Sequence, residues 1–190
     1  RLYVSHGTEL VVDDTSTNQV AGRITDTPGV HGIAIVPEIN RAFTSNGREN
    51  KVSVVDLKTL QTLSKVDTEA NPDAILYEPK QKEIYALNHT GHSATAFEAA
   101  TGKVTATIPL AGTAETGQPD PGLGRVFVNI EDKDSVDVID IGKQQVVANW
   151  PVAPASSPTG MAIDPQSHRH FVGGGKALLE LSTELRYSFR

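Results

Sequence analysis

Several side chains that can bind hard cations or move protons recur at wide intervals along this sequence. They are one histidine, two carboxylates and three amides: His31, Asp73, Glu131, Asn46, Asn88 and Asn129. Amide and carboxylate oxygens suit Ca²⁺, which takes about six to eight oxygen ligands. We therefore expect a divalent metal ion, calcium above all, held by Asn46, Asp73, Asn88, Asn129 and Glu131. His31 beside it would be the general base for a water that the metal polarises.

Each of these residues also has a purely structural interpretation. Asparagine is common in left-handed turn positions, surface carboxylates are usually solvated, and His31 could be a packed loop residue. The functional interpretation depends on whether the fold brings the six residues together.

Their spacing reflects an internal repeat of about 42 residues. Four prolines end apolar segments: Pro37, Pro79, Pro121 and Pro165. Six residues after each proline comes an aromatic residue: Phe43, Tyr85, Phe127 and Phe171. Carboxylates recur at the same interval: Asp14, Asp56, Glu98 and Asp140. Because three sets of markers keep one interval, we predict a single domain of repeated units over residues 1–190.

Each repeat unit alternates apolar and polar residues with period two, which predicts half-buried strands. In the second unit we expect four strands, over residues 41–46, 52–55, 62–66 and 72–77. Asp14, Asp56 and Asp140 are expected to begin tight turns, in which the carboxylate accepts hydrogen bonds from backbone amides two residues on.

Each of four repeats carries a similar string: Tyr3-Val-Ser-His6, Phe43-Thr-Ser-Asn46, Tyr85-Ala-Leu-Asn88 and Phe127-Val-Asn-Ile130. With the run Pro158-Thr-Gly-Met-Ala-Ile-Asp-Pro165, the chain resembles the YVTN-repeat β-propeller family over nearly its whole length. The resemblance implies an all-β fold, a β-propeller of four-stranded antiparallel blades whose Pro-bounded segments are the innermost strands. The chain would supply about five blades where that family usually has seven, with repeats at about 1–39, 40–81, 82–123, 124–167 and a partial 168–190.

Two segments depart from the repeat. Residues 111–122 occupy an innermost-strand position without its apolar alternation, so we expect a loose or irregular inner edge there. Residues 176–190 fit only with a shortened turn, and Leu178, Leu181 and Leu185 are also compatible with one face of a helix. The first repeat lacks its own innermost strand. Open strand edges recruit partners, so a homo-oligomer formed through these edges is a further expectation.

The repeat also predicts which loops share a face. In a four-strand meander, alternate connections lie on the same side of the sheet. Loops that enter the innermost strands therefore lie beside loops that leave the second strands. We expect His31 and Asp73 from the first set to meet the asparagines and Glu131 from the second at the mouth of the central tunnel.

Composition excludes several classes of function. The net charge is −6 and no basic cluster occurs, which argues against a nucleic-acid partner. The chain has no cysteine, which rules out disulfides, thiolate nucleophiles and Cys-based zinc sites. Its longest apolar runs are far shorter than a membrane span. The sequence opens inside a strand-like segment, so a removed leader or a truncation is an open expectation. With the family resemblance, this favours a periplasmic or secreted protein.

These observations favour a metal-assisted hydrolase that acts on a small neutral lactone or ester at the tunnel mouth. The alternative is a non-catalytic propeller that binds a partner or serves as a scaffold, and a redox module is a weaker third idea. Other local motifs carry less weight. The pair His89 and His92 is interpreted as exposed turn histidines, and the glycines before Lys176 do not form a P-loop.

Overall fold

The computed structural model describes residues 1–167 and 169–182, which form five antiparallel β-sheets. The first sheet contains β1 (Leu2–His6), β2 (Glu9–Asp14) and β3 (Gln19–Ile24). The second contains β4 (Val30–Val36), β5 (Arg41–Asn46), β6 (Lys51–Asp56) and β7 (Thr62–Asp67). The third contains β8 (Pro72–Glu78), β9 (Glu83–Asn88), β10 (Ser93–Glu98) and β11 (Val104–Pro109).

The fourth sheet contains β12 (Ala114–Asp120), β13 (Arg125–Ile130), β14 (Ser135–Asp140) and β15 (Gln145–Pro151). The fifth contains β16 (Pro158–Asp164), β17 (Arg169–Gly174) and β18 (Ala177–Ser182). Two short 3₁₀ turns, η1 (Pro37–Ile39) and η2 (Glu131–Lys133), complete the described elements.

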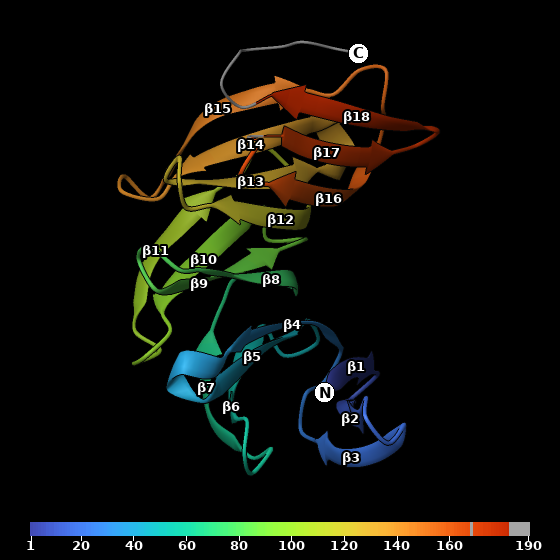
Figure 1. The fold of residues 1–190 in the computed structure, drawn as a ribbon. Coiled ribbons are helices and arrows are strands. Elements are labelled where there is room, and N and C mark those ends of the chain that lie inside the picture. Colours follow the sequence, from blue (N-terminus) through green and yellow to red (C-terminus); the bar gives the residue numbers. More distant parts are fainter. Residues whose placement is uncertain (168, 183–190) are drawn as a thin grey trace.

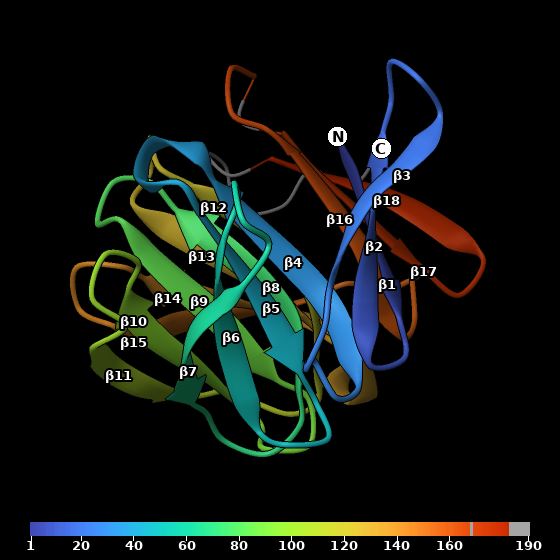
Figure 2. The ribbon, with the colours of Figure 1, turned by 90° about the horizontal axis from the view of Figure 1, so that it is seen from below.

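The sheets follow one another along an arc (Figure 1). Within each sheet the strands pair in chain order, so β4, β8, β12 and β16 are the first strands of their sheets and contact one another in succession. Seen from below, the first and last sheets lie on the same side of the molecule, opposite the outer strands β7, β11 and β15 (Figure 2). The all-β architecture expected from the repeat is therefore confirmed, and it has the arrangement of a β-propeller.

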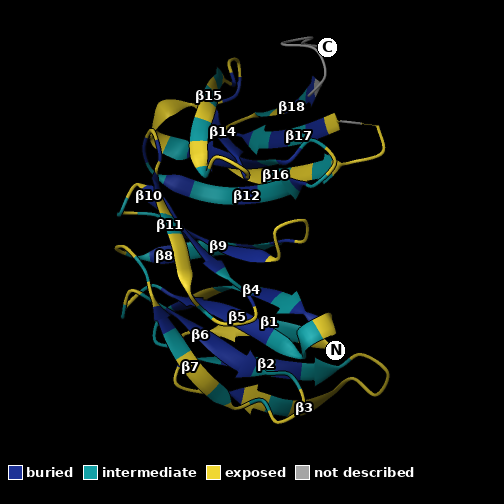
Figure 3. Ribbon diagram, turned by 90° about the vertical axis from the view of Figure 1, so that its left-hand side faces the viewer, coloured by how far each residue is buried: buried dark blue, intermediate teal, exposed yellow. Residues whose placement is uncertain are grey.

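Burial follows strand position within each sheet (Figure 3). In the second, third and fourth sheets, the second and third strands are buried on both faces, as in β9 and β14, where every residue is buried. The outer strands β11 and β15 are largely exposed or half-buried. The middle strands have a neighbouring sheet on each face, which explains why they read as near-continuous apolar runs.

The hydrophobic core is divided into layers between successive sheets. Leu10 and Val55 pack in the layer between the first and second sheets, and Phe43 and Phe97 in the next one, with ring centroids 5.9 Å apart. Two further layers follow, between the third and fourth and between the fourth and fifth sheets. Each sheet therefore buries its faces against its immediate neighbours.

The tight turns form as expected. The Asp14 carboxylate accepts a hydrogen bond from the Ser16 amide at 2.8 Å, Asp56 from Lys58 at 2.9 Å and Asp140 from Gly142 at 3.0 Å. Each bond spans two residues, so this prediction is confirmed.

The irregularity expected at residues 111–122 is a single β-bulge between Ala114 and Gly117. On either side of it β12 pairs with β13, and the bulge occurs at the same place as those in β4 and β8. Apolar alternation is weak there because Gly117-Gln-Pro119 follows the bulge, where β4 has Ile33-Ala-Ile35 and β8 has Ile75-Leu-Tyr77.

The two ends of the chain differ from the central sheets. Leu178 and Leu181 lie in β18, so the structure favours a strand over the helical alternative, while Leu185 lies outside the described residues. The first sheet has three strands and lacks an inner one, as the first repeat predicted. Among the described residues, no helix has the length and apolar character needed to cross a membrane.

Candidate functional site

The inner strands β4, β8 and β12 each carry a β-bulge near their start. In β4 the paired positions pass from Val30 opposite Asn46 to Ile33 opposite Thr44, so two residues of β4 face one residue of β5. The same shift occurs in β8 and in β12. Bulges re-aim side chains that regular pleating would place elsewhere. The bulged residues, which lie outside the regular pairing, are His31 and Gly32, Asp73 and Ala74, and Glu115 and Thr116.

These six residues line one pocket of about 280 Å³. It opens at the face where the inner strands begin, as the connection rule predicted for His31 and Asp73. His31, Asp73 and Glu115 occupy the same position in three successive repeats, because 42 residues separate each from the next. The pocket is therefore a direct product of the repeat.

Two of the predicted residues form an ion pair at this pocket. His31 Nδ1 lies 2.8 Å from Asp73 Oδ1, and the two side chains are 56% and 24% exposed. When Nδ1 carries the proton, the ring donates it to Asp73 and keeps the lone pair of Nε2 available. This is the orientation that a general base needs.

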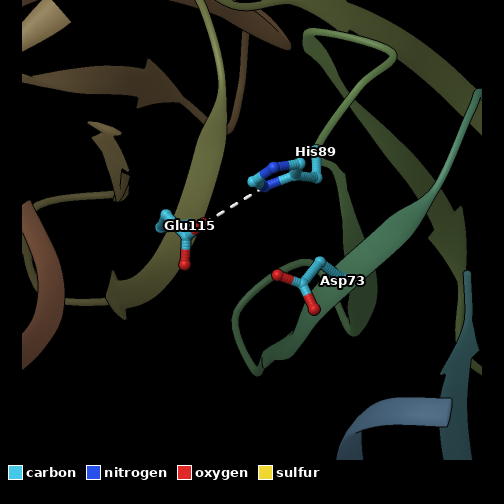
Figure 4. Close-up of side chains that lie close together, drawn as sticks. All are labelled: Asp73, His89 and Glu115. Carbon is cyan, nitrogen blue, oxygen red and sulfur yellow. Dashed lines mark ion pairs between the residues drawn. The ribbon is translucent and has the colours of Figure 1, made fainter. Parts of the chain in front are cut away.

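A second histidine joins the same cluster (Figure 4). His89, in the turn after β9, places Nδ1 3.2 Å from Glu115 Oε1 and 3.2 Å from the carbonyl oxygen of Ala114. One potential ligand atom from each of Asp73, His89 and Glu115 lies within 4.8 Å of the other two. All three side chains are half-buried, so they are shielded but still accessible.

Negative charge accumulates at this point. Burial and the nearby Asp73 carboxylate raise the pKa of Glu115, with a smaller contribution from Glu131, while His89 opposes the rise. Within residues 1–167 and 169–182, the ion pairs of Asp73 and Glu115 are made with His31 and His89. No described lysine or arginine neutralises either carboxylate, so the cluster is suited to a cation.

The structure does not bring Asn46 and Asn88 to the pocket. Both side chains are fully buried inside their sheets. Asn46 Nδ2 donates to Ser53 and Glu49, each at 2.8 Å. Asn88 Nδ2 donates to Ser93 and Thr95, each at 3.0 Å. Successive side chains of a strand alternate between faces. Asn46 and Asn88 therefore point to the face opposite to that of the preceding residues, Ser45 and Leu87, which lie opposite the bulges.

Asn129 lies elsewhere for a different reason. It stands one position earlier in its string than Asn46 and Asn88 do, and it is the residue that faces the bulge in β12. Its Nδ2 donates to the carbonyl oxygen of Gly160 in β16 at 3.1 Å, and the residue is fully buried. The three asparagines are thus structural neighbours of the site and do not line it.

Of the six predicted residues, His31 and Asp73 line the pocket, and Glu131 lies near enough to Glu115 to help raise its pKa. The structure adds Glu115, Thr116 and His89. Glu115 could have been found by extending the 42-residue interval from His31 and Asp73. His89 was interpreted as an exposed turn residue because its partners come from other repeats. Its place in the cluster depends on how the third and fourth sheets pack.

Comparisons with known proteins support the fold alone. No family model and no curated protein sequence matches the chain. Among solved structures, the chain is similar to hydrazine synthase of Kuenenia stuttgartiensis, with a TM-score of 0.80 and 17% sequence identity. The match covers 91% of this chain and 55% of the hydrazine synthase chain, so this chain spans about half the length of that protein.

Proposed function

We propose that this pocket binds a divalent metal ion through Asp73, His89 and Glu115 and hydrolyses a small neutral lactone or ester. The observation that carries the proposal is the convergence of these three side chains, with ligand atoms within 4.8 Å of one another, beside the His31–Asp73 pair. The three residues come from β8, β12 and the turn after β9, so the packing of two sheets is needed to build the set.

The donor set fits a divalent ion of the zinc class. Its members are one imidazole and two carboxylates, and imidazole suits zinc and other transition metals, whereas calcium prefers oxygen ligands throughout. The backbone carbonyl of Ala114 is placed to accept the Nδ1 proton of His89, which would leave Nε2 as the metal-binding nitrogen. Since Asn46, Asn88 and Asn129 are buried and do not line the pocket, calcium becomes the comparison ion in the experiment.

When bound, the ion would act as a Lewis acid that polarises the carbonyl of the substrate. His31 Nε2 removes a proton from water, and the oxygen of that water attacks the carbonyl carbon. As the carbon–oxygen bond of the ester breaks, the imidazolium returns the proton to the departing oxygen. Asp73 holds the ring through Nδ1 and stabilises its positive charge during the step. A pocket of about 280 Å³ limits the substrate to a small molecule.

The test is hydrolysis of small lactones and aryl esters by purified protein before chelation, after chelation, and after addition of Zn²⁺ or Ca²⁺. His31→Ala should lower kcat at least about 100-fold, the usual contribution of a general base. His92→Ala is the matched control, because His92 is an exposed histidine of the turn that carries His89. Activity that survives both chelation and His31→Ala would contradict the proposal.

A non-catalytic binding role is the second candidate, favoured by the free strands of the end sheets. Leu2 and Val4 in β1 are 53% and 42% exposed, and Leu178 in β18 is 71% exposed. Such strands offer unpaired backbone groups and apolar side chains to a second copy. This role predicts no turnover and a mass in solution of at least twice the chain mass. A monomer that hydrolyses lactones would exclude it.

We also propose that the chain belongs to the YVTN-repeat family of β-propellers. The strings Phe43-Thr-Ser-Asn46 and Tyr85-Ala-Leu-Asn88 support a YVTN-repeat propeller, and with that assignment a periplasmic or secreted location. Fractionation of the native host's cells, with detection of this chain by antibody, would test the location.

A further inference from the structure

We propose that Ser45 positions the His31–Asp73 pair, an inference that builds on the function proposed for this pocket. Ser45 lies in β5 and is fully buried. Its Oγ accepts a hydrogen bond from the Gly32 amide at 2.9 Å and donates one to the main-chain carbonyl of Asp73. One hydroxyl thus joins β4 of the second sheet to β8 of the third, at the residue next to His31 and at Asp73 itself.

The bulge brings the Gly32 amide to this hydroxyl. Because His31 and Gly32 together face Ser45, the Gly32 amide has no partner position in the ladder between β4 and β5. A buried amide without a partner is costly, and the Ser45 side chain satisfies it. The same atom then sets how closely β8 approaches, since it also bonds Asp73.

Gly32 completes the contact from the other side. A Cβ atom at this position would lie 3.1 Å from Ile75 Cγ2 and 3.3 Å from both Asp73 O and Ser45 Oγ. These separations are tighter than most Cβ contacts, so a side chain here would require its neighbours to shift by a few tenths of an ångström. The absence of a side chain at Gly32 therefore permits the close approach of β4 and β8 that places His31 Nδ1 within reach of Asp73.

The other repeats show that the fold itself does not require this hydroxyl. The residue that faces the bulge is Leu87 in the third sheet and Asn129 in the fourth. Leu87 offers no polar atom, yet its sheet has the same bulge and the same pairing. Asn129 bonds the carbonyl of Gly160 in the next sheet. In the part of the chain that the structure describes, a side chain facing a bulge makes the double contact only at the His31–Asp73 pair.

We therefore expect Ser45 to act through the orientation of His31. With the contact intact, β4 and β8 hold Asp73 Oδ1 against Nδ1, so the neutral ring carries its proton on Nδ1. Without the hydroxyl the two strands can separate slightly, and the Nδ1 bond to Asp73 weakens. Solvent then competes for the proton and the ring becomes a mixture of its two neutral forms.

The experiment compares Ser45→Ala, Ser45→Thr and the matched control Ser53→Ala. This control removes another fully buried serine of the second sheet, in the adjacent strand β6, whose hydroxyl accepts a hydrogen bond from Asn46. Nitrogen-15 NMR of the His31 ring in metal-free protein at alkaline pH reports which nitrogen carries the proton. We expect the Nδ1–H form in the wild type and in Ser53→Ala, a mixture in Ser45→Ala, and at least partial recovery in Ser45→Thr. In active protein, Ser45→Ala should lower kcat about 10- to 100-fold with little change in KM.

Gly32→Ala is the second variant, and it serves if Ser45→Ala does not fold. It pushes β4 and β8 apart from the opposite side and should produce the same mixture of ring forms. An unchanged His31 ring in the folded variants, or an equal change in Ser53→Ala, would overturn the role of Ser45. If the wild type neither binds metal nor hydrolyses esters, the proposed function is contradicted. The role of Ser45 is still tested in that case, because NMR of the His31 ring requires neither metal nor substrate.

Discussion

At the scale of single residues, the site holds carboxylates that pair with histidines and that no described lysine or arginine neutralises. Burial and the neighbouring Asp73 carboxylate raise the pKa of Glu115, so its ionised form is disfavoured in the metal-free protein. A cation would reverse that disadvantage. Such a conflict between stability and ligand binding is common where groups are placed for function.

Replacement of Glu115 by glutamine should therefore have opposite effects on two properties. At pH 7 we expect metal-free Glu115→Gln to unfold at higher denaturant concentration than the wild type, because a repelled, half-buried charge is removed. Its affinity for Zn²⁺ should fall at least about tenfold, since even residues behind the ligands have effects of that size. Denaturant titration and Zn²⁺ calorimetry measure the two effects. The control is Glu69→Gln, outside the cluster, and loss of stability without loss of metal affinity would contradict the prediction.

At the scale of elements, turns and bulges organise each sheet. The Asp56 carboxylate accepts hydrogen bonds from the Thr59 and Lys58 amides and lies 3.3 Å from Arg41 Nη1. The Thr59 bond is the largest cause of a lowered pKa at Asp56, with burial acting against it and Lys58 and Arg41 adding to it. The ionised form therefore stabilises the turn between β6 and β7.

The pH dependence of this turn follows from the sign of the shift. Because the pKa of Asp56 in the folded state is below its usual 3.8, the stabilisation is complete above that value and is lost as the pH falls through and below it. Asp56→Asn should therefore destabilise the protein at neutral pH, and the difference from the wild type should shrink in acid. Urea unfolding across this range measures it. Asp67→Asn, in an exposed position at the far end of β7, is the control and should give only a small difference at neutral pH.

At the scale of the whole molecule, stability resides in the layers between sheets. Each sheet packs on its neighbours, so the fold resembles a repeat array whose interfaces hold the units together. Phe43 is fully buried and meets Phe97 across the layer between the second and third sheets.

Phe43→Ala should lower the free energy of unfolding by about 3–5 kcal/mol, the usual cost of emptying an aromatic site in a core. Leu63→Ala is the control, because Leu63 is 51% exposed. It should change stability by less than about 0.5 kcal/mol. Equal effects of the two substitutions in denaturant titration would show that the layer between these sheets contributes little.

Much of the fold was predictable because its signals are local and repeated. Proline, aromatic and acidic markers at a 42-residue interval indicated the four-strand unit, and Asp14, Asp56 and Asp140 indicated the turns. The strand expected at 52–55 is β6, Lys51–Asp56. Residues 111–122 were harder to interpret because Gly117-Gln-Pro119 lacks the apolar side chains that β4 and β8 carry at the same positions.

The site was only half predictable, for a reason that lies in strand geometry. The repeat established that loops entering the inner strands share a face with loops leaving the second strands, which was enough to associate His31 with Asp73 and Glu131. Which side chain enters the pocket is decided by single-residue shifts, because adjacent residues of a strand point to opposite faces. Packing of the sheets and the bulges in β4, β8 and β12 turned Glu115 inward, kept Asn46 and Asn88 inside their sheets, and brought His89 to a carboxylate from another repeat.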